Sequence, residues 1–263
     1  MAKATTVKAK KKYQEIIFSL PAFERGGQSR RFHQKVHARI GWPVLRLRIQ
    51  KEKDMIMGLY KKFVNQTRKP EGFLGKMMVD GMNSGHAKLA DWGMTHLSGT
   101  TPEKIAELGC GGGRNTAELL KRYPKATATA LDYSEVSVKK AETLNKGMIA
   151  SGRCTVIQGN VAEMPFADSA FDLATAFETI YFWPGLEHCF SEVCRVLRPG
   201  GVFLICNESD GTDETSQKYE KIIEGMKCYT VEEITEALTA AGFSDVSSDH
   251  YNGKPWITVV ARK

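Results

Sequence analysis

Short apolar runs alternate with amphipathic segments in the chain after Lys104. Residues 105–108 predict a brief buried strand that ends at a glycine, and residues 114–122 have the composition of a helix. The runs at 126–131 and 202–206 predict two more strands. Strands that alternate with helices in this way indicate a doubly wound α/β fold on a mainly parallel sheet.

The C-terminal part of the chain has a different pattern. Residues 231–241 predict a helix that is closed by Gly242. Two further runs, 246–251 and 256–261, flank an Asn-Gly dipeptide, which favours the tight turn of a hairpin. We therefore expect the last two strands to form an antiparallel pair.

The first part of the chain differs from the rest in charge. Residues 1–70 hold 18 Lys/Arg and 4 Asp/Glu, a net charge of +14, and because the whole chain carries +7, residues 71–263 carry −7. Residues 43–64 have the apolar spacing of an amphipathic helix that begins at a proline. We predict a basic, largely helical arm over 1–70, packed on a ligand-binding domain over 71–263.

A basic arm can contact nucleic acid, an anionic membrane surface or the acidic domain of its own chain. No nucleic-acid-binding motif accompanies this arm, so a solvated lysine-rich segment is the simpler interpretation and nucleic acid is disfavoured as a partner. Homo-oligomerisation through the arm stays open.

Composition is that of an ordinary globular protein, with 42% hydrophobic and 25% charged residues. The sequence holds no run of about 18 apolar residues and no secretory signal, so we expect a cytoplasmic protein without a membrane span. The six cysteines lie far apart and lack metal-ligand spacing, which predicts reduced thiols and no metal site. His33 and His37 stand four apart, but no third ligand is near them, and we assign them no role.

The most informative segment follows the first predicted strand. Gly109, Gly111 and Gly113 precede the next helix, and glycine permits positive φ and a close approach of the backbone to a ligand. The start of that helix offers free N–H groups that attract a carboxylate or a phosphate. Asp132 ends the second strand, where a carboxylate can bind both ribose hydroxyls, and Ser134 can cap the following helix. These features predict a nucleotide-type cofactor.

Five segments stand in a recognisable order along the chain. They are Glu107–Gly113, Leu131–Ser134, Val156–Phe166, Phe171–Ala176 and Arg195–Gly201. Together they resemble the glycine loop, second-strand end, adenine-binding turn, fourth strand and helix-to-strand corner of class I S-adenosylmethionine-dependent methyltransferases. The resemblance implies a seven-stranded Rossmann-like sheet whose last strand pair is antiparallel. It also implies S-adenosylmethionine as the cofactor, with S-adenosylhomocysteine as the product.

The resemblance implies roles for single residues. Glu107 and the 109–113 loop would hold the methionine end, Asp132 the ribose and Asn160 with Val161 the adenine, which Tyr133 would flank. The family usually has Asp where this chain has Asn160, whose amide oxygen can still accept a hydrogen bond. The full cofactor-binding set is Glu107, Gly109, Cys110, Gly111, Gly113, Asn115, Asp132, Tyr133, Ser134, Asn160, Val161, Ala162 and Phe177.

Candidate catalytic residues lie near the end of the fourth predicted strand and before the first. Glu178 can bind the cofactor's amino group or act as a base, and Tyr181 belongs to an aromatic cluster that can shape a pocket or simply pack in the core. His86 lies in a polar stretch, Met82–Gly93, that resembles the cofactor-covering segment of small-molecule methyltransferases. A partly buried structural histidine is an equal alternative for His86.

Residues 208–229 follow the fifth predicted strand, where the family usually builds a substrate lid. The predicted substrate-contacting set is Tyr181, Trp183, Tyr219, Met226 and Tyr229. For Trp183 ordinary core packing is an almost equal alternative.

The sequence therefore predicts an enzyme that methylates a small molecule at an O, N, S or C nucleophile. RNA or protein methylation is an alternative, although the fourth strand ends in Phe177-Glu178-Thr179-Ile180 and not in a base-methylation signature. A binding or regulatory module without turnover is another. A nicotinamide-dependent oxidoreductase is disfavoured, because Arg114 stands where a dinucleotide loop has Gly or Ala.

Overall fold

A computed structural model describes the protein over residues 42–263. The chain divides into two compact units, Met1–Gly58 and Leu59–Lys263. The first described helix is α3, Trp42–Val64, which confirms the helix predicted over 43–64. Residues 59–70, assigned to the basic arm from their charge, belong to the larger unit. His33 and His37 lie outside the described residues.

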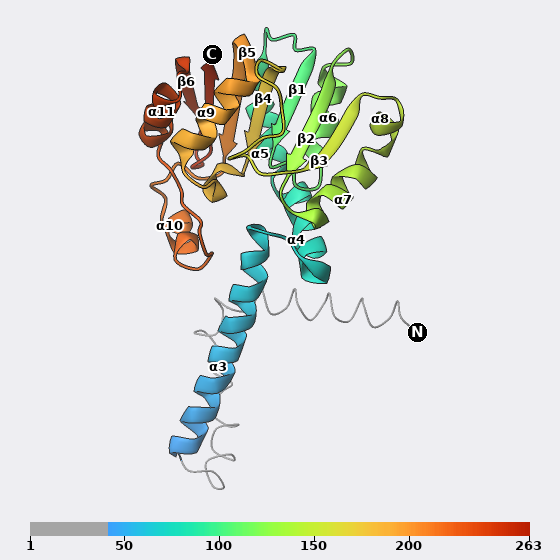
Figure 1. Cartoon of the computed structure of the whole chain (residues 1–263). Helices are drawn as coiled ribbons and strands as arrows, with labels where there is room; N and C mark the ends of the chain where they lie inside the picture. The colour runs from blue at the N-terminus through green and yellow to red at the C-terminus, as the bar shows by residue number, and fades with distance from the viewer. Residues whose placement is uncertain (1–41) are drawn as a thin grey trace. The chain divides into compact units, whose positions relative to one another are not determined.

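A single seven-stranded sheet runs through the larger unit in the order β3-β2-β1-β4-β5-β7-β6 (Figure 1). The strands are β1 Lys104–Leu108, β2 Thr127–Asp132, β3 Cys154–Gln158, β4 Phe171–Phe177, β5 Leu197–Asn207, β6 Ser244–His250 and β7 Ile257–Arg262. The first five are parallel, whereas β7 is antiparallel to both β5 and β6. The predicted fold class and the antiparallel terminal pair are confirmed.

Helices pack on both faces of this sheet (Figure 1). After α3, the helical elements are η1 Asn65–Thr67, α4 Gly72–Gly85, α5 Ala87–Gly93, η2 Met94–Leu97, α6 Arg114–Arg122, α7 Glu135–Leu144, α8 Lys146–Ala150, η3 Ile180–Phe182, α9 Leu186–Val196, α10 Glu214–Glu220 and α11 Val231–Ala240. The predicted bounds of α6 are correct. Those of β2 and β7 are shifted by one residue, and β5 starts five residues earlier than predicted, because Leu197 already pairs with Phe171.

Two apolar clusters form on the two faces of the sheet. Alternate residues of β5 enter opposite clusters: Phe203 and Ile205 join α9 and α11, while Leu204 and Cys206 join α5 and α6. This alternation explains why the central strands read as nearly continuous apolar runs. The sheet is therefore a rigid platform that holds the strand ends in place.

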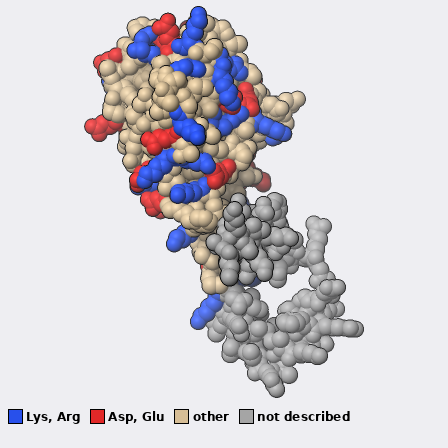
Figure 2. Space-filling model, turned by 90° about the vertical axis from the view of Figure 1, so that its right-hand side faces the viewer, with Lys and Arg blue, Asp and Glu red and all other residues tan. Residues whose placement is uncertain are grey.

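All six cysteines are unpaired, and only Cys194 is not buried. None of the helices described over 42–263 is long and apolar enough to cross a membrane. On the face shown in Figure 2, Lys and Arg side chains are interspersed with Asp and Glu over the described surface. That part of the surface presents mixed charge.

Candidate cofactor and active site

A cavity of about 350 Å³ lies at the carboxyl ends of the parallel strands. Its volume is in the range of small-ligand sites, and its place is the one where doubly wound sheets bind ligands. Its walls include many of the predicted site residues: His86, Gly109, Cys110, Gly111, Asn115, Asp132, Tyr133, Asn160, Val161, Phe177, Glu178 and Trp183. The fold thus brings together residues from three of the five recognised segments.

The glycine loop between β1 and α6 forms one wall of the cavity. Gly109 has φ of +77°, and a Cβ there would lie 2.1 Å from Thr179 Oγ1. Gly112 has no positive φ, but its Cβ would lie 2.1 Å from Asn83 Nδ2. The loop therefore needs glycine because other segments press against it, in addition to its backbone conformation. No side chain caps the first turn of α6, so that turn offers N–H groups to an anionic ligand.

Asp132 lies at the tip of β2 beside this loop. Its Oδ2 accepts a hydrogen bond from Gly111 N–H and its Oδ1 one from Ser134 N–H, both at 2.8 Å. Burial raises the pKa of Asp132 above its usual value, while the two N–H donors oppose this. A carboxylate has about four lone-pair sites, so two remain for the hydroxyls of a ribose. Ser134 caps α7 through Ser137 N–H, as predicted.

Glu107 lies on β1 behind the glycine loop and not on the cavity wall. Its side chain is 1% exposed, and Oε2 accepts a hydrogen bond from the Thr116 hydroxyl of α6. Burial, and secondly the charge of Asp132, raise the pKa of Glu107 to about 8. Glu107 is therefore protonated at neutral pH in the absence of a ligand.

The predicted adenine end holds Tyr133, Asn160 and Val161 on the cavity wall. Asn160 Oδ1 accepts a hydrogen bond from Ala162 N–H at 3.0 Å, which leaves one lone pair for a ligand. The Tyr133 hydroxyl donates to the Arg68 carbonyl, so its ring is held against the cavity edge. Gly113, Ser134 and Ala162 support these residues without lining the cavity.

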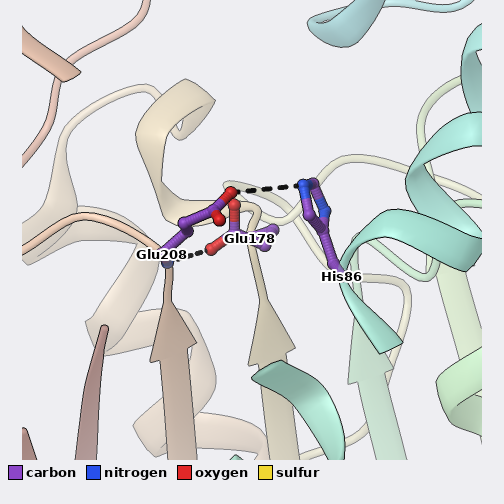
Figure 3. Close-up of side chains that lie close together, drawn as sticks. All are labelled: His86, Glu178 and Glu208. Carbon is purple, nitrogen blue, oxygen red and sulfur yellow. Dashed lines mark hydrogen bonds and ion pairs between the residues drawn. The ribbon is translucent and has the colours of Figure 1, made fainter. Parts of the chain in front are cut away.

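The opposite end of the cavity collects ionisable side chains from three segments (Figure 3). His86 joins α4 to α5, Glu178 follows β4 and Glu208 follows β5. Glu178 has φ of +60°, and its Oε1 accepts hydrogen bonds from the Tyr181 hydroxyl at 3.2 Å and from Glu208 N–H. Burial raises the pKa of Glu178 to about 7, although His86 opposes the rise. A carboxyl group with such a pKa can exchange a proton at neutral pH.

Tyr181 is buried and does not line the cavity. Its hydroxyl donates to Glu178 and accepts from Ser209 N–H at 3.1 Å, so it links the ends of β4 and β5. Phe182 and Trp183 do line the cavity, and Trp183 also stacks on Phe203 in the core. Tyr181 thus holds Glu178 in position.

The predicted lid residues lie elsewhere. Tyr219, Met226 and Tyr229 are not on the cavity wall; Tyr219 contacts Tyr60 of α3, and the Tyr229 ring lies under the Lys227 ammonium. The 208–229 segment instead borders η1, where Asn65 Nδ2 donates to the Ile222 carbonyl at 3.2 Å.

Sequence reasoning missed a short strap, residues 67–70, that crosses the cavity edge. Thr67, Arg68 and Pro70 line the cavity, and the Pro70 carbonyl accepts a hydrogen bond from the Ser134 hydroxyl at 2.8 Å. Nothing in the local pattern distinguishes these residues from the rest of the basic segment. The remaining wall residues not predicted as site residues are Met82, Asn83, Leu89, Ala90, Gly112, Arg114, Leu131, Ser137, Gly159, Thr179, Phe182 and Pro184.

Comparison with known proteins supports a common origin for this domain. Residues 106–205 match the family model described as "Methyltransferase domain". A sterol 24-C-methyltransferase of Gibberella zeae is 30% identical over 178 residues, which cover 62% of this chain and 47% of the relative. A 24-methylenesterol C-methyltransferase of Arabidopsis thaliana is also 30% identical, over 48% of this chain and 35% of the relative. The chain spans less than half of the length of these curated relatives.

Solved structures share the fold. Human N-acetylserotonin methyltransferase in complex with S-adenosylmethionine superposes with a TM-score of 0.60 at 18% identity, over 72% of this chain and 56% of that chain. Geranyl diphosphate C-methyltransferase from Streptomyces coelicolor, bound to Mg²⁺, geranyl diphosphate and S-adenosylhomocysteine, gives a TM-score of 0.60 at 14% identity. The match covers 74% of this chain and 85% of that chain.

The sheet order, the glycine loop and the strand-end carboxylate are the features expected of a domain that binds a nucleotide-type cofactor. Residues 106–205 match the methyltransferase domain model, and solved methyltransferases share the fold of the chain. The cofactor that the sequence predicts for this domain is S-adenosylmethionine. The residues present fit that cofactor: Asp132 keeps lone pairs for two hydroxyls, the first turn of α6 is uncapped, and the cavity reaches both.

Proposed function

We propose that this protein transfers the methyl group of S-adenosylmethionine to a small-molecule acceptor. The observation that carries the proposal is one cavity lined by two chemically distinct groups of residues: the glycine loop with Asp132, and His86 with Glu178 and Trp183. A cavity of about 350 Å³ suits a cofactor and a small acceptor better than a macromolecule. The names of the relatives, which are sterol methyltransferases, support this choice.

The cofactor, when bound, supplies a methyl group on a positively charged sulfur, which needs no further activation. Asp132 would hold the ribose hydroxyls, and the first turn of α6 would hold the carboxylate of the methionine end. Asn160 and Val161 would contact the adenine beside the Tyr133 ring. These contacts orient the reacting group, and the buried cavity wall excludes water from it.

At the other end, His86 and Glu178 would contact the acceptor, and Tyr181 would position Glu178 through its hydroxyl. Trp183 and Phe182 add apolar surface beside them. The 208–229 segment would close over this end as a lid, with Tyr219, Met226 and Tyr229 moving toward the acceptor only on closure. Oligomerisation through residues 1–70 remains a prediction.

Isothermal calorimetry with S-adenosylmethionine, S-adenosylhomocysteine and NADH tests the cofactor. We expect both sulfur compounds to bind and NADH not to bind. Asp132→Ala removes hydrogen bonds to a charged group of about 1.5–3 kcal/mol each, so affinity should fall at least tenfold with the fold intact by circular dichroism. Asp249→Ala, an exposed aspartate outside the cavity wall, is the matched control. Near-normal affinity of Asp132→Ala contradicts the site assignment.

Methyl transfer is then measured with radiolabelled cofactor. Transfer to sterol, isoprenoid or other small acceptors supports the proposal. Labelling of RNA or protein alone would favour the macromolecular alternative, and cofactor binding without transfer to any acceptor would favour a regulatory module.

A further inference from the structure

Three potential metal ligands converge at the acceptor end of the cavity. One nitrogen of His86 and one carboxylate oxygen each from Glu178 and Glu208 lie within 4.8 Å of one another. Figure 3 shows the three side chains pointing toward a common centre from three separate segments. His86 Nε2 and Glu208 Oε2 are 3.6 Å apart, which is longer than a hydrogen bond.

The charge of this group is not balanced by its neighbours. Among the side chains that the structure describes, residues 50–51 and 53–263, the only ion-pair partner of either carboxylate is His86, which is charged only when protonated. No Lys or Arg described over the same range pairs with Glu178 or Glu208. Two ionised carboxylates this close repel each other, and a cation between them removes the repulsion.

The distances between these ligand atoms suit a single bound metal ion. Two ligand atoms about 2.1 Å from a tetrahedral ion lie about 3.4 Å from each other, close to the distance between His86 and Glu208. Glu178 Oε1 accepts both of the hydrogen bonds described above, which leaves Oε2 available. His86 and Glu178 line the cavity, so an ion here keeps an open coordination position toward the acceptor.

We infer that His86, Glu178 and Glu208 bind a divalent cation, with Zn²⁺ favoured because one imidazole and two carboxylates form a mixed nitrogen and oxygen ligand set. The inference departs from the sequence-based expectation of no metal, which considered only cysteine and histidine spacing. It deepens the proposed function and rests on it for the role of the ion.

An ion at this site favours a substrate whose hydroxyl oxygen accepts the methyl group. A hydroxyl oxygen bound to the ion releases its proton to water more readily, because the cation stabilises the oxyanion. The oxygen lone pair forms the new O–CH3 bond, while the S–CH3 bond breaks and its electron pair stays on the sulfur of S-adenosylhomocysteine. In this arrangement Glu178 is a ligand, and the ion replaces it in promoting loss of the proton.

The test is calorimetric titration of chelator-treated, full-length protein with ZnCl2. We expect one Zn²⁺ per chain, and at least a tenfold loss of affinity in both His86→Ala and Glu208→Gln. Glu208 is exposed, so its substitution leaves the fold unchanged. The matched control is Asp249→Asn, because Asp249 and His96 form a similar pair at 2.9 Å without a third ligand; its affinity should change less than twofold.

Absence of stoichiometric binding to the wild type would overturn the inference, as would wild-type affinity in both His86→Ala and Glu208→Gln. Titration of the same metal-free protein with S-adenosylhomocysteine distinguishes a failure of the metal site from a failure of the proposed function. Cofactor binding without Zn²⁺ binding removes only the metal site, whereas loss of cofactor binding removes the proposed function.

Discussion

Replacing Glu107 with Gln should make the stability of the protein less dependent on pH. Glu107 is 1% exposed on β1, and its pKa is about 8 in the folded protein against an ordinary value of 4.5. Between these two pH values the native state holds a proton that the unfolded chain has released. Unfolding therefore releases a proton, so the free energy of unfolding falls as pH rises from about 4.5 to about 8.

The size of the effect follows from the shift. A difference of about 3.5 pH units corresponds to about 4 to 5 kcal/mol at about 1.36 kcal/mol per unit, an upper limit because a buried site relaxes when it ionises. Gln stays neutral and can accept the same hydrogen bond from Thr116. Relative to wild type, the variant should therefore gain on the order of 2–4 kcal/mol between pH 5 and pH 9.

Urea unfolding of both proteins at pH 5, 7 and 9, without cofactor, measures the difference between their free energies of unfolding. The contributions of the other titrating groups cancel in this difference, because both proteins share them. Glu142→Gln, at an exposed position of α7, controls for the loss of a carboxylate itself. A difference between Glu107→Gln and wild type that is the same at all three pH values would refute the reasoning, because it would mean that Glu107 is ionised throughout. Calorimetry of the Glu107→Gln variant with S-adenosylmethionine tests the predicted role of Glu107 in holding the methionine end of the cofactor.

Two further predictions address the cavity. In Gly112→Ala, the new Cβ would lie 2.1 Å from Asn83 Nδ2, so the Asn83 side chain must move; we expect a loss of about 1–3 kcal/mol in stability and weaker cofactor binding. Gly147→Ala, where a Cβ meets nothing within 4 Å, is its control, and equal melting temperatures would contradict the prediction. Deleting residues 1–35 should leave cofactor affinity unchanged, because the wall residues that the structure describes begin at Thr67; a calorimetric loss of binding would place the arm in the site.

Local patterns were sufficient to predict the sheet and many of the residues that line the cavity, whose roles in cofactor binding stay predictions. Asp132 and Gly109 lie directly at strand ends, so their positions follow once the strands are recognised. Even there, the pattern did not show that Glu107 turns away from the cavity toward Thr116. Whether a strand-end side chain faces the cavity or the core depends on packing with distant helices.

The acceptor end was less accessible to sequence reasoning. His86 and Glu178 were singled out separately, but Glu208 joins them only because β4 and β5 are neighbours in register. Tyr181 follows a turn that directs its ring inward, so an aromatic residue expected in the pocket became a support for Glu178. Neither outcome has a signal in local spacing, because each depends on contacts between segments far apart in the chain.

The contacts between η1 and the 208–229 segment also bear on how ligands reach the cavity. Asn65 bonds the backbone at Ile222 and Glu224, which are 157 and 159 positions away, through only two hydrogen bonds. One of these bonds is part-buried and the other is exposed, so the contact is weakly held. We therefore expect η1 and residues 208–229 to separate while the sheet stays folded. The rate of this separation would then set how fast cofactor and acceptor exchange.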